Sequence, residues 1–170
     1  YKYCFSSLLN HKFSNRHTNR TGLIIHRIQY KYDVKANTNV ANNDTADFFV
    51  KSRGFASYYQ FDSQATFKLT EKIDKTAGLH FMLLNTNNKV SIEPRIGINW
   101  KLSENHKLSF AYGKHSKIEP LRIYLMEVKT DSGFETLNKE LEVTKAHHFV
   151  LSYDWKISQN AHLRLSLIHI

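Results

Sequence analysis

Polar and apolar residues alternate with a period of two along most of the chain. From Val90 to Lys101 the even-numbered positions hold Val, Ile, Pro, Ile, Ile and Trp, and the odd-numbered positions hold Ser, Glu, Arg, Gly, Asn and Lys. Successive side chains of a β-strand point to opposite faces, whereas a helix would spread these apolar residues around every side. The pattern therefore predicts a strand with one apolar and one polar face.

The same alternation recurs in other segments and predicts an all-β, antiparallel chain of about eight amphipathic strands. The segment 120–128 has the weakest alternation and fits a strand extension or a hairpin within a loop. The predicted strands lie near 1–14, 21–35, 55–69, 76–85, 90–101, 106–115, 120–128 and 144–156, with another starting near 160.

The predicted connections differ in length in an ordered way. Two are long, at 36–54 and 116–143, and one of modest length lies at 85–89. Outer-membrane β-barrels have short turns at the periplasmic end and longer loops at the other end, whereas a soluble sandwich has no reason to separate them. The short connections alternate with these longer ones and lie at 14–20, 70–75, 102–105 and 157–160.

The composition fits strands that cross a membrane better than helices that do so. The chain has 9 Tyr and 11 Phe, and its longest apolar runs have three or four residues, such as Phe81–Leu84. A spanning helix needs ~18 consecutive apolar residues, whereas a spanning strand needs only ~9–11 alternating ones.

Several aromatic residues are predicted to lie beside turns, as in the aromatic girdles of such barrels: Tyr1, Tyr3, Tyr30, Tyr32, Phe55, Tyr58, Tyr59, Trp100 and Trp155.

The excess of basic residues does not indicate a nucleic-acid partner. The formal net charge is +9, but Lys101, Lys107, Lys114 and Lys117 recur singly along strands and at turns. Nucleic-acid binding calls for a basic face. We therefore expect no nucleic-acid partner.

No constellation in the sequence indicates catalysis, a cofactor or a metal site. His147 and His148 are adjacent on a predicted strand, so they point to opposite faces, and the other histidines show no ligand spacing. Glu140 and Glu142 fit a solvated loop edge, and Cys4 has no cysteine partner. There is no Gly-rich phosphate loop and no nucleophile elbow. We therefore expect a protein that is not an enzyme.

The two faces of the strands predict where lipid and water lie. A sheet in hydrocarbon has to close on itself, so its apolar face meets lipid and its polar face lines a lumen. This register turns Lys68, Gln64, Arg27 and Asp154 inward. The lumen-facing residues expected to line a ligand path are Asp62, His80, Glu93, Arg95 and Asn99.

Three segments carry a resemblance to a known family: residues 10–22 (NHKFSNRHTNRTG), 91–97 (SIEPRIG) and 108–121 (LSFAYGKHSKIEPL). Residues 137–141 and 145–148 fit the same pattern. These segments resemble the C-terminal barrel wall of TonB-dependent outer-membrane receptors, in the subgroup with an N-terminal carboxypeptidase-regulatory-like domain. The resemblance implies a plugged 22-stranded barrel in the outer membrane. That barrel imports a scarce nutrient with energy delivered through a TonB contact of the plug.

We expect the chain to be a portion of such a receptor, without the plug and the energy-coupling box. Its start, Tyr1–Cys4, has no initiator Met and no signal-peptide pattern. Residues 1–164 are predicted to be barrel wall. The last six residues, Leu165–Ile170, match the translation of a transposon-end sequencing adapter. An artefact of assembled reads is therefore expected there, the alternative being a genuine strand.

Two other classes of protein fit parts of the pattern. One is a different outer-membrane barrel, either porin-like or an enzyme barrel, which would have no plug. The other is a soluble β-sandwich binding module. The sandwich predicts that Phe61, Ile96 and Leu108 pack against a second sheet.

Overall fold

The computed structural model describes residues 1–39, 45–130 and 133–170, and it consists almost entirely of strands. The one helix among these residues is a single turn long. The elements in chain order are β1 (Lys2–Lys12), β2 (His17–Asn39), β3 (Thr45–Lys68), β4 (Ile73–Leu84), β5 (Lys89–Lys101), β6 (His106–Lys117), α1 (Leu121–Tyr124), β7 (Glu127–Thr130), β8 (Gly133–Glu135), β9 (Thr144–Lys156) and β10 (His162–His169).

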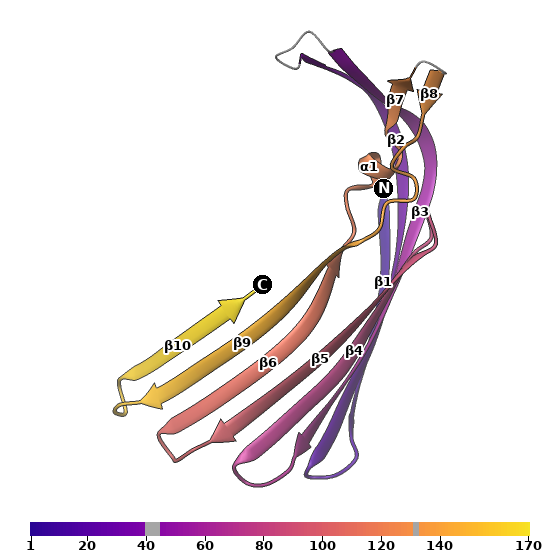
Figure 1. Ribbon diagram of the computed structural model, residues 1–170. Coiled ribbons are helices and arrows are strands. Elements are labelled where there is room, and N and C mark those ends of the chain that lie inside the picture. The colour runs from indigo at the N-terminus through magenta and orange to yellow at the C-terminus, as the bar shows by residue number, and fades with distance from the viewer. Residues whose placement is uncertain (40–44, 131–132) are drawn as a thin grey trace.

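All ten strands belong to one antiparallel sheet, which confirms the predicted all-β, antiparallel class, although the prediction was of about eight strands. Eight of them lie side by side in the order β1-β2-β3-β4-β5-β6-β9-β10, while β7 pairs with β3 and β8 pairs with β7. The sheet is curved and open, with β1 and β10 at its two edges (Figure 1). Among the described residues, no helix is long and apolar enough to cross a membrane.

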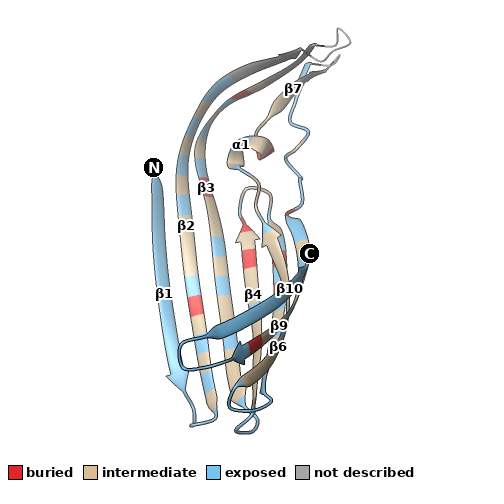
Figure 2. Ribbon diagram, turned by 90° about the vertical axis from the view of Figure 1, so that its left-hand side faces the viewer, coloured by how far each residue is buried: buried red, intermediate tan, exposed pale blue. Residues whose placement is uncertain are grey.

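Exposure along β5 is the reverse of what a soluble sheet shows. Ile92 and Trp100 are 53% and 47% exposed, whereas Ser91 and Glu93 are 2% exposed. The face that carries Ser91 and Glu93, here called the inner face, is the one on which α1 lies (Figure 2). The opposite, outer face carries the apolar residues.

The register extends these faces across neighbouring strands. Leu23, Phe61, Phe81 and Ile92 are successive cross-strand partners on β2 to β5, and all four lie on the outer face. Because side chains of a strand alternate strictly, a one-residue slip would turn every apolar group to the inner face. The outer face of β2 to β5 therefore carries a row of apolar side chains that runs from strand to strand.

The small apolar core lies where the connection between β6 and β9 covers the inner face. At its centre Tyr124 of α1 is fully buried, and its hydroxyl accepts a hydrogen bond from the backbone N–H of Glu119 at 3.3 Å. Burial raises the pKa of Tyr124. The other buried apolar residues are Val50, Ala56, Met82, Leu84 and Val143.

The four hairpin turns at one end of the sheet share one construction, which the sequence analysis missed. Each begins with an apolar residue and then Ser or Thr: 13–16 (FSNR), 69–72 (LTEK), 102–105 (LSEN) and 157–161 (ISQNA). The hydroxyl of the Ser or Thr accepts a backbone N–H two residues on, an arrangement that stabilises tight turns. The four distances, for Ser14, Thr70, Ser103 and Ser158, are 3.1, 3.1, 3.3 and 3.3 Å.

The prediction of a long loop at 36–54 is wrong. Residues 36–39 belong to β2 and residues 45–54 belong to β3, and the two strands stay paired as far as Asn39 and Thr45. Residues 40–44 lie outside the described part. These segments do not alternate apolar and polar residues, but a two-stranded ribbon is held by backbone hydrogen bonds, which need no apolar face. Tyr30 and Phe55 consequently lie within strands and not beside a turn.

Two further predictions need correction. Arg27 lies on the outer face with Leu23, because β2 carries apolar residues on both faces near Ile24 and only its pairing decides the register. There its guanidinium lies 4.8 Å from the centre of the Phe55 ring.

The segment 120–128 contains α1 and the first residues of the β7–β8 hairpin, so the loop-hairpin alternative is confirmed in part.

Candidate functional site

The buried carboxylate of Glu93 is the centre of a polar cluster on the inner face. Its Oε1 accepts hydrogen bonds from the backbone N–H of Ser116, at 3.1 Å, and from the Ser116 hydroxyl. Its Oε2 accepts a hydrogen bond from Nη2 of Arg95 at 3.0 Å. A buried charge is tolerated when it is paired and hydrogen-bonded in this way. The cluster joins β5 to β6.

Pro94 explains why Glu93 reaches β6. Proline has no N–H to give to a neighbouring strand, and the pairing of β5 with β6 ends beside it, at Arg95 and Gly113. β6 continues to Lys117 without β5 as its partner. The Glu93 side chain accepts the Ser116 N–H at the level where the backbone pairing has stopped.

His80 and Ser91 complete the cluster. His80 on β4 is the direct cross-strand partner of Glu93, and its Nδ1 lies 3.1 Å from Oε2 of the carboxylate. The angle is not that of a hydrogen bond, so the contact becomes an ion pair only when the imidazole is protonated. The Ser116 hydroxyl lies 2.6 Å from the Ser91 hydroxyl.

Four of the five residues predicted for the ligand path lie close together. Asp62, His80 and Glu93 are successive cross-strand partners on β3, β4 and β5, and Arg95 is the next inner residue of β5. Gly22, the partner of Asp62 on β2, leaves room for this row, because a Cβ there would lie 2.5 Å from the Asp62 carboxylate. Their role in binding a ligand stays a prediction.

Asn99 lies apart from this cluster. Asn99 is six positions after Glu93 on β5, which corresponds to roughly 20 Å of extended strand. Its Oδ1 accepts a hydrogen bond from the hydroxyl of Ser109 on β6, at 2.8 Å. Asn99 therefore belongs to a separate polar row, nearer the short turns.

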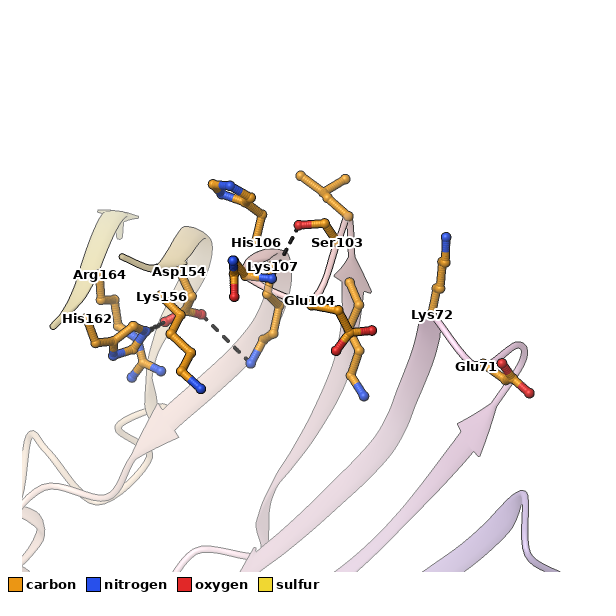
Figure 3. A pocket seen from close by; sticks show the side chains of 13 residues that line it. Glu71, Lys72, Ser103, Glu104, His106, Lys107, Asp154, Lys156, His162 and Arg164 are labelled. Carbon is orange, nitrogen blue, oxygen red and sulfur yellow. Dashed lines mark hydrogen bonds and ion pairs between the residues drawn. The ribbon is translucent and has the colours of Figure 1, made fainter. Parts of the chain in front are cut away.

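A second charged cluster lies at the short-turn end of the inner face, around Asp154 (Figure 3). Asp154 is 8% exposed and accepts a hydrogen bond from Nε of Arg164. Nζ of Lys107 lies 3.8 Å from Oδ2, and Nε2 of His162 lies 3.5 Å from Oδ1. The sequence placed Asp154 on the inner face. Its partners could not be assigned without the strand order, because β6, and not β8, pairs with β9.

The acidic edge of the connection before β9 is tied to β5. Nζ of Lys89 lies 3.1 Å from Glu142 and 3.6 Å from Glu140, and Nδ2 of Asn87 donates a hydrogen bond to the Leu141 carbonyl at 3.0 Å. The hydrogen bond from Lys89 lowers the pKa of Glu142. Both carboxylates are largely exposed, so each ion pair stabilises the fold only slightly.

The histidines contact aromatic rings and each other. Nδ1 of His147 lies 2.9 Å from the Tyr112 hydroxyl on the outer face, and the rings of His115 and His148 lie 4.7 Å apart on the inner face. Within residues 1–39, 45–130 and 133–170, no three His, Cys, Asp or Glu side chains group so as to hold a metal ion.

No protein-family model matches this chain, and no curated protein matches it at a significant level. Proposals about its function therefore depend on the strand register, on the exposure of the two faces and on the residues themselves.

Proposed function

We propose that this chain is part of the wall of an outer-membrane β-barrel, and that the barrel is a TonB-dependent receptor that imports a scarce nutrient. The observation that carries the membrane proposal is the reversed exposure of the two faces. Monomeric soluble proteins rarely expose contiguous apolar patches larger than a few hundred Å². Here exposed apolar side chains lie on the outer face of at least five neighbouring strands, while Glu93 and Ser91 on the inner face are buried.

The height of the apolar surface fits a bilayer. On β5 it extends from Val90 to Trp100, which is ten steps along the strand. At about 3.4 Å per residue and a tilt of about 40°, this corresponds to a band roughly 26 Å tall. The apolar band of outer-membrane barrels is about 25 Å tall.

The distribution of connections supports an orientation. Four turns of similar construction lie at one end of the sheet, whereas α1, β7 and β8, which belong to the long connection between β6 and β9, lie at the other end. By the rule for outer-membrane barrels, the short turns face the periplasm and the long connection faces the outside.

The exposed outer face also argues against a soluble sandwich. In a sandwich Phe61 and Ile96 would be covered by a second sheet, but they are 45% and 37% exposed. The choice of a receptor over a porin-like barrel rests on the sequence resemblance. In this proposal Asp62, His80, Glu93 and Arg95 line the ligand path, and the plug of the full-length protein makes the TonB contact.

The two tryptophans provide a test of the membrane proposal that needs no mutation. Trp100 and Trp155 are the two tryptophans of the chain, and both lie on the outer face near the short turns. In lipid vesicles their fluorescence should be quenched strongly by lipids brominated close to the headgroup, and less by lipids brominated near the chain end. Quenching no stronger than for a water-soluble tryptophan would contradict the proposal.

The import function is tested in the full-length protein. Receptor-type uptake should stop when the proton gradient of the inner membrane is dissipated, whereas diffusion through a porin-like barrel should continue. Deletion of residues 118–143 should lower the uptake rate, because this connection lies at the proposed outer end. Uptake that persists without the gradient would exclude the receptor and leave the porin-like barrel.

A further inference from the structure

We propose that the hollow at the short-turn end of the inner face binds a phosphate group. This proposal does not depend on the receptor function. The hollow is open, has a volume of about 760 Å³ and lies over the ends of β5, β6, β9 and β10, next to the turn between β3 and β4. Its charged lining comprises five basic and three acidic side chains, besides His106 and His162: Lys72, Lys101, Lys107, Lys156 and Arg164, with Glu71, Glu104 and Asp154.

The register brings positive charge together along one row. Lys101, Lys107, Asp154 and Arg164 are successive cross-strand partners on the inner face. Like charges directly opposite each other destabilise a sheet, and Lys101 lies directly opposite Lys107. Asp154 offsets only part of this charge, because Arg164 and Lys107 already share its two oxygens.

Several ammonium groups remain available to a ligand. In the described part of the chain, Lys72, Lys101 and Lys156 make no ion pair. In Figure 3 the side chains of Lys107, Lys156 and Arg164 extend into the same space beside Asp154. Lys156 is the next inner residue after Asp154 and the cross-strand partner of His162, which places it beside the row.

A phosphate group is the ligand that this arrangement fits. It carries up to two negative charges and several acceptor oxygens, so it can bind several cations at once. Arginine binds phosphate through its planar fork of N–H groups, and lysine binds it as a point charge. Such a ligand would remove the repulsion between Lys101 and Lys107. The phosphate could be free in solution or belong to a lipid headgroup.

The test uses the whole chain in neutral detergent micelles, with inorganic pyrophosphate as the probe in a calorimetric titration at low salt. The double variant Lys101→Gln/Lys156→Gln should bind pyrophosphate at least ~10-fold more weakly, because two charge-assisted contacts are lost. The matched control is Lys12→Gln/Lys68→Gln, which removes the same charge from the inner face of β1 and β3. It should bind pyrophosphate like the unmodified chain.

A second titration with monomeric dihexanoyl-phosphatidylglycerol identifies the source of the phosphate. Saturable binding of either probe that depends on Lys101 and Lys156 but not on Lys12 and Lys68 supports the site. Such binding of the lipid alone assigns it to a headgroup. Equal losses in both double variants would show that only net charge matters, and that result would overturn the proposal. Failure of both probes to bind would overturn it as well.

Discussion

Ser116 donates its backbone N–H to the carboxylate of Glu93 at 3.1 Å, at the level where β5 has stopped pairing with β6. A side chain thus takes the place of a backbone acceptor between two neighbouring strands. Because Glu93 also accepts hydrogen bonds from Arg95 and from the Ser116 hydroxyl, a single carboxylate satisfies several buried donors.

The variant Glu93→Gln should destabilise the fold by about 1–3 kcal/mol, because a buried charged acceptor is lost while Arg95 and Ser116 keep their donors. The measurement is urea-induced unfolding in detergent micelles. Glu104→Gln, in an exposed turn, is the control and should change the stability by less than about 0.5 kcal/mol. Equal effects of the two variants would show that the Glu93 cluster contributes nothing specific.

The turn construction predicts a difference between two substitutions at Thr70. Its hydroxyl accepts the backbone N–H groups of Lys72 and Ile73, at 3.1 and 3.0 Å. Thr70→Val has nearly the same volume but no acceptor, and should destabilise the fold by about 0.5–1.5 kcal/mol. Thr70→Ser keeps the hydroxyl and should leave the unfolding midpoint close to that of the unmodified chain. A Ser variant as unstable as the Val variant would assign the effect to packing.

The two faces of β5 should respond differently to a new charge in a lipid bilayer. Ile96→Arg places a guanidinium on the outer face near the middle of the apolar band, and should cost roughly 2–4 kcal/mol if that face meets lipid. Asn99→Arg places the same group on the inner face and should cost much less. The measurement is the urea midpoint of the chain folded into vesicles. Similar costs at the two positions would contradict the assignment of the outer face to lipid.

The contact between Lys89 and Glu142 predicts a titration. The pKa of Glu142 is lowered from its ordinary value of 4.5, first by the hydrogen bond from Lys89. A lowered folded pKa stabilises the fold above the unfolded pKa, and this contribution is lost as the pH falls through the folded pKa. In Lys89→Ala the pKa of Glu142 should therefore rise toward 4.5.

Carboxyl-carbon NMR measures this titration directly. An unchanged Glu142 pKa in Lys89→Ala would mean that the ion pair does not form in solution.

Alternation was sufficient to predict most of the sheet. For β5, with Ile92 and Glu93 on opposite faces, the predicted strand at 90–101 differs from the observed one by a single residue. It failed for β2 beyond Tyr30 and for β3 before Phe55, where the two strands pair although apolar and polar residues do not alternate in the sequence. It also misplaced Arg27, because an apolar run such as Leu23–Ile25 fits either register.

The inner-face clusters could be predicted only in part. Glu93 and Arg95 are two positions apart on one strand, so the sequence places them on the same face. Their contact with Ser116 required the register of β6 after Pro94, which no local pattern contains. The partners of Asp154 likewise required the order of the strands, because Lys107 is far from it in sequence.

Antiparallel strands with one apolar and one polar face follow from the residue pattern, because the period of two is a property of each strand alone. The folded chain was needed to show that the apolar face is the exposed one, that Glu93 is buried against Ser116, and that Lys101, Lys107 and Arg164 share a row with Asp154. These facts depend on which strands are neighbours, at what register, and on which side the sheet is covered. Pairing energies between residues distant in sequence decide all three.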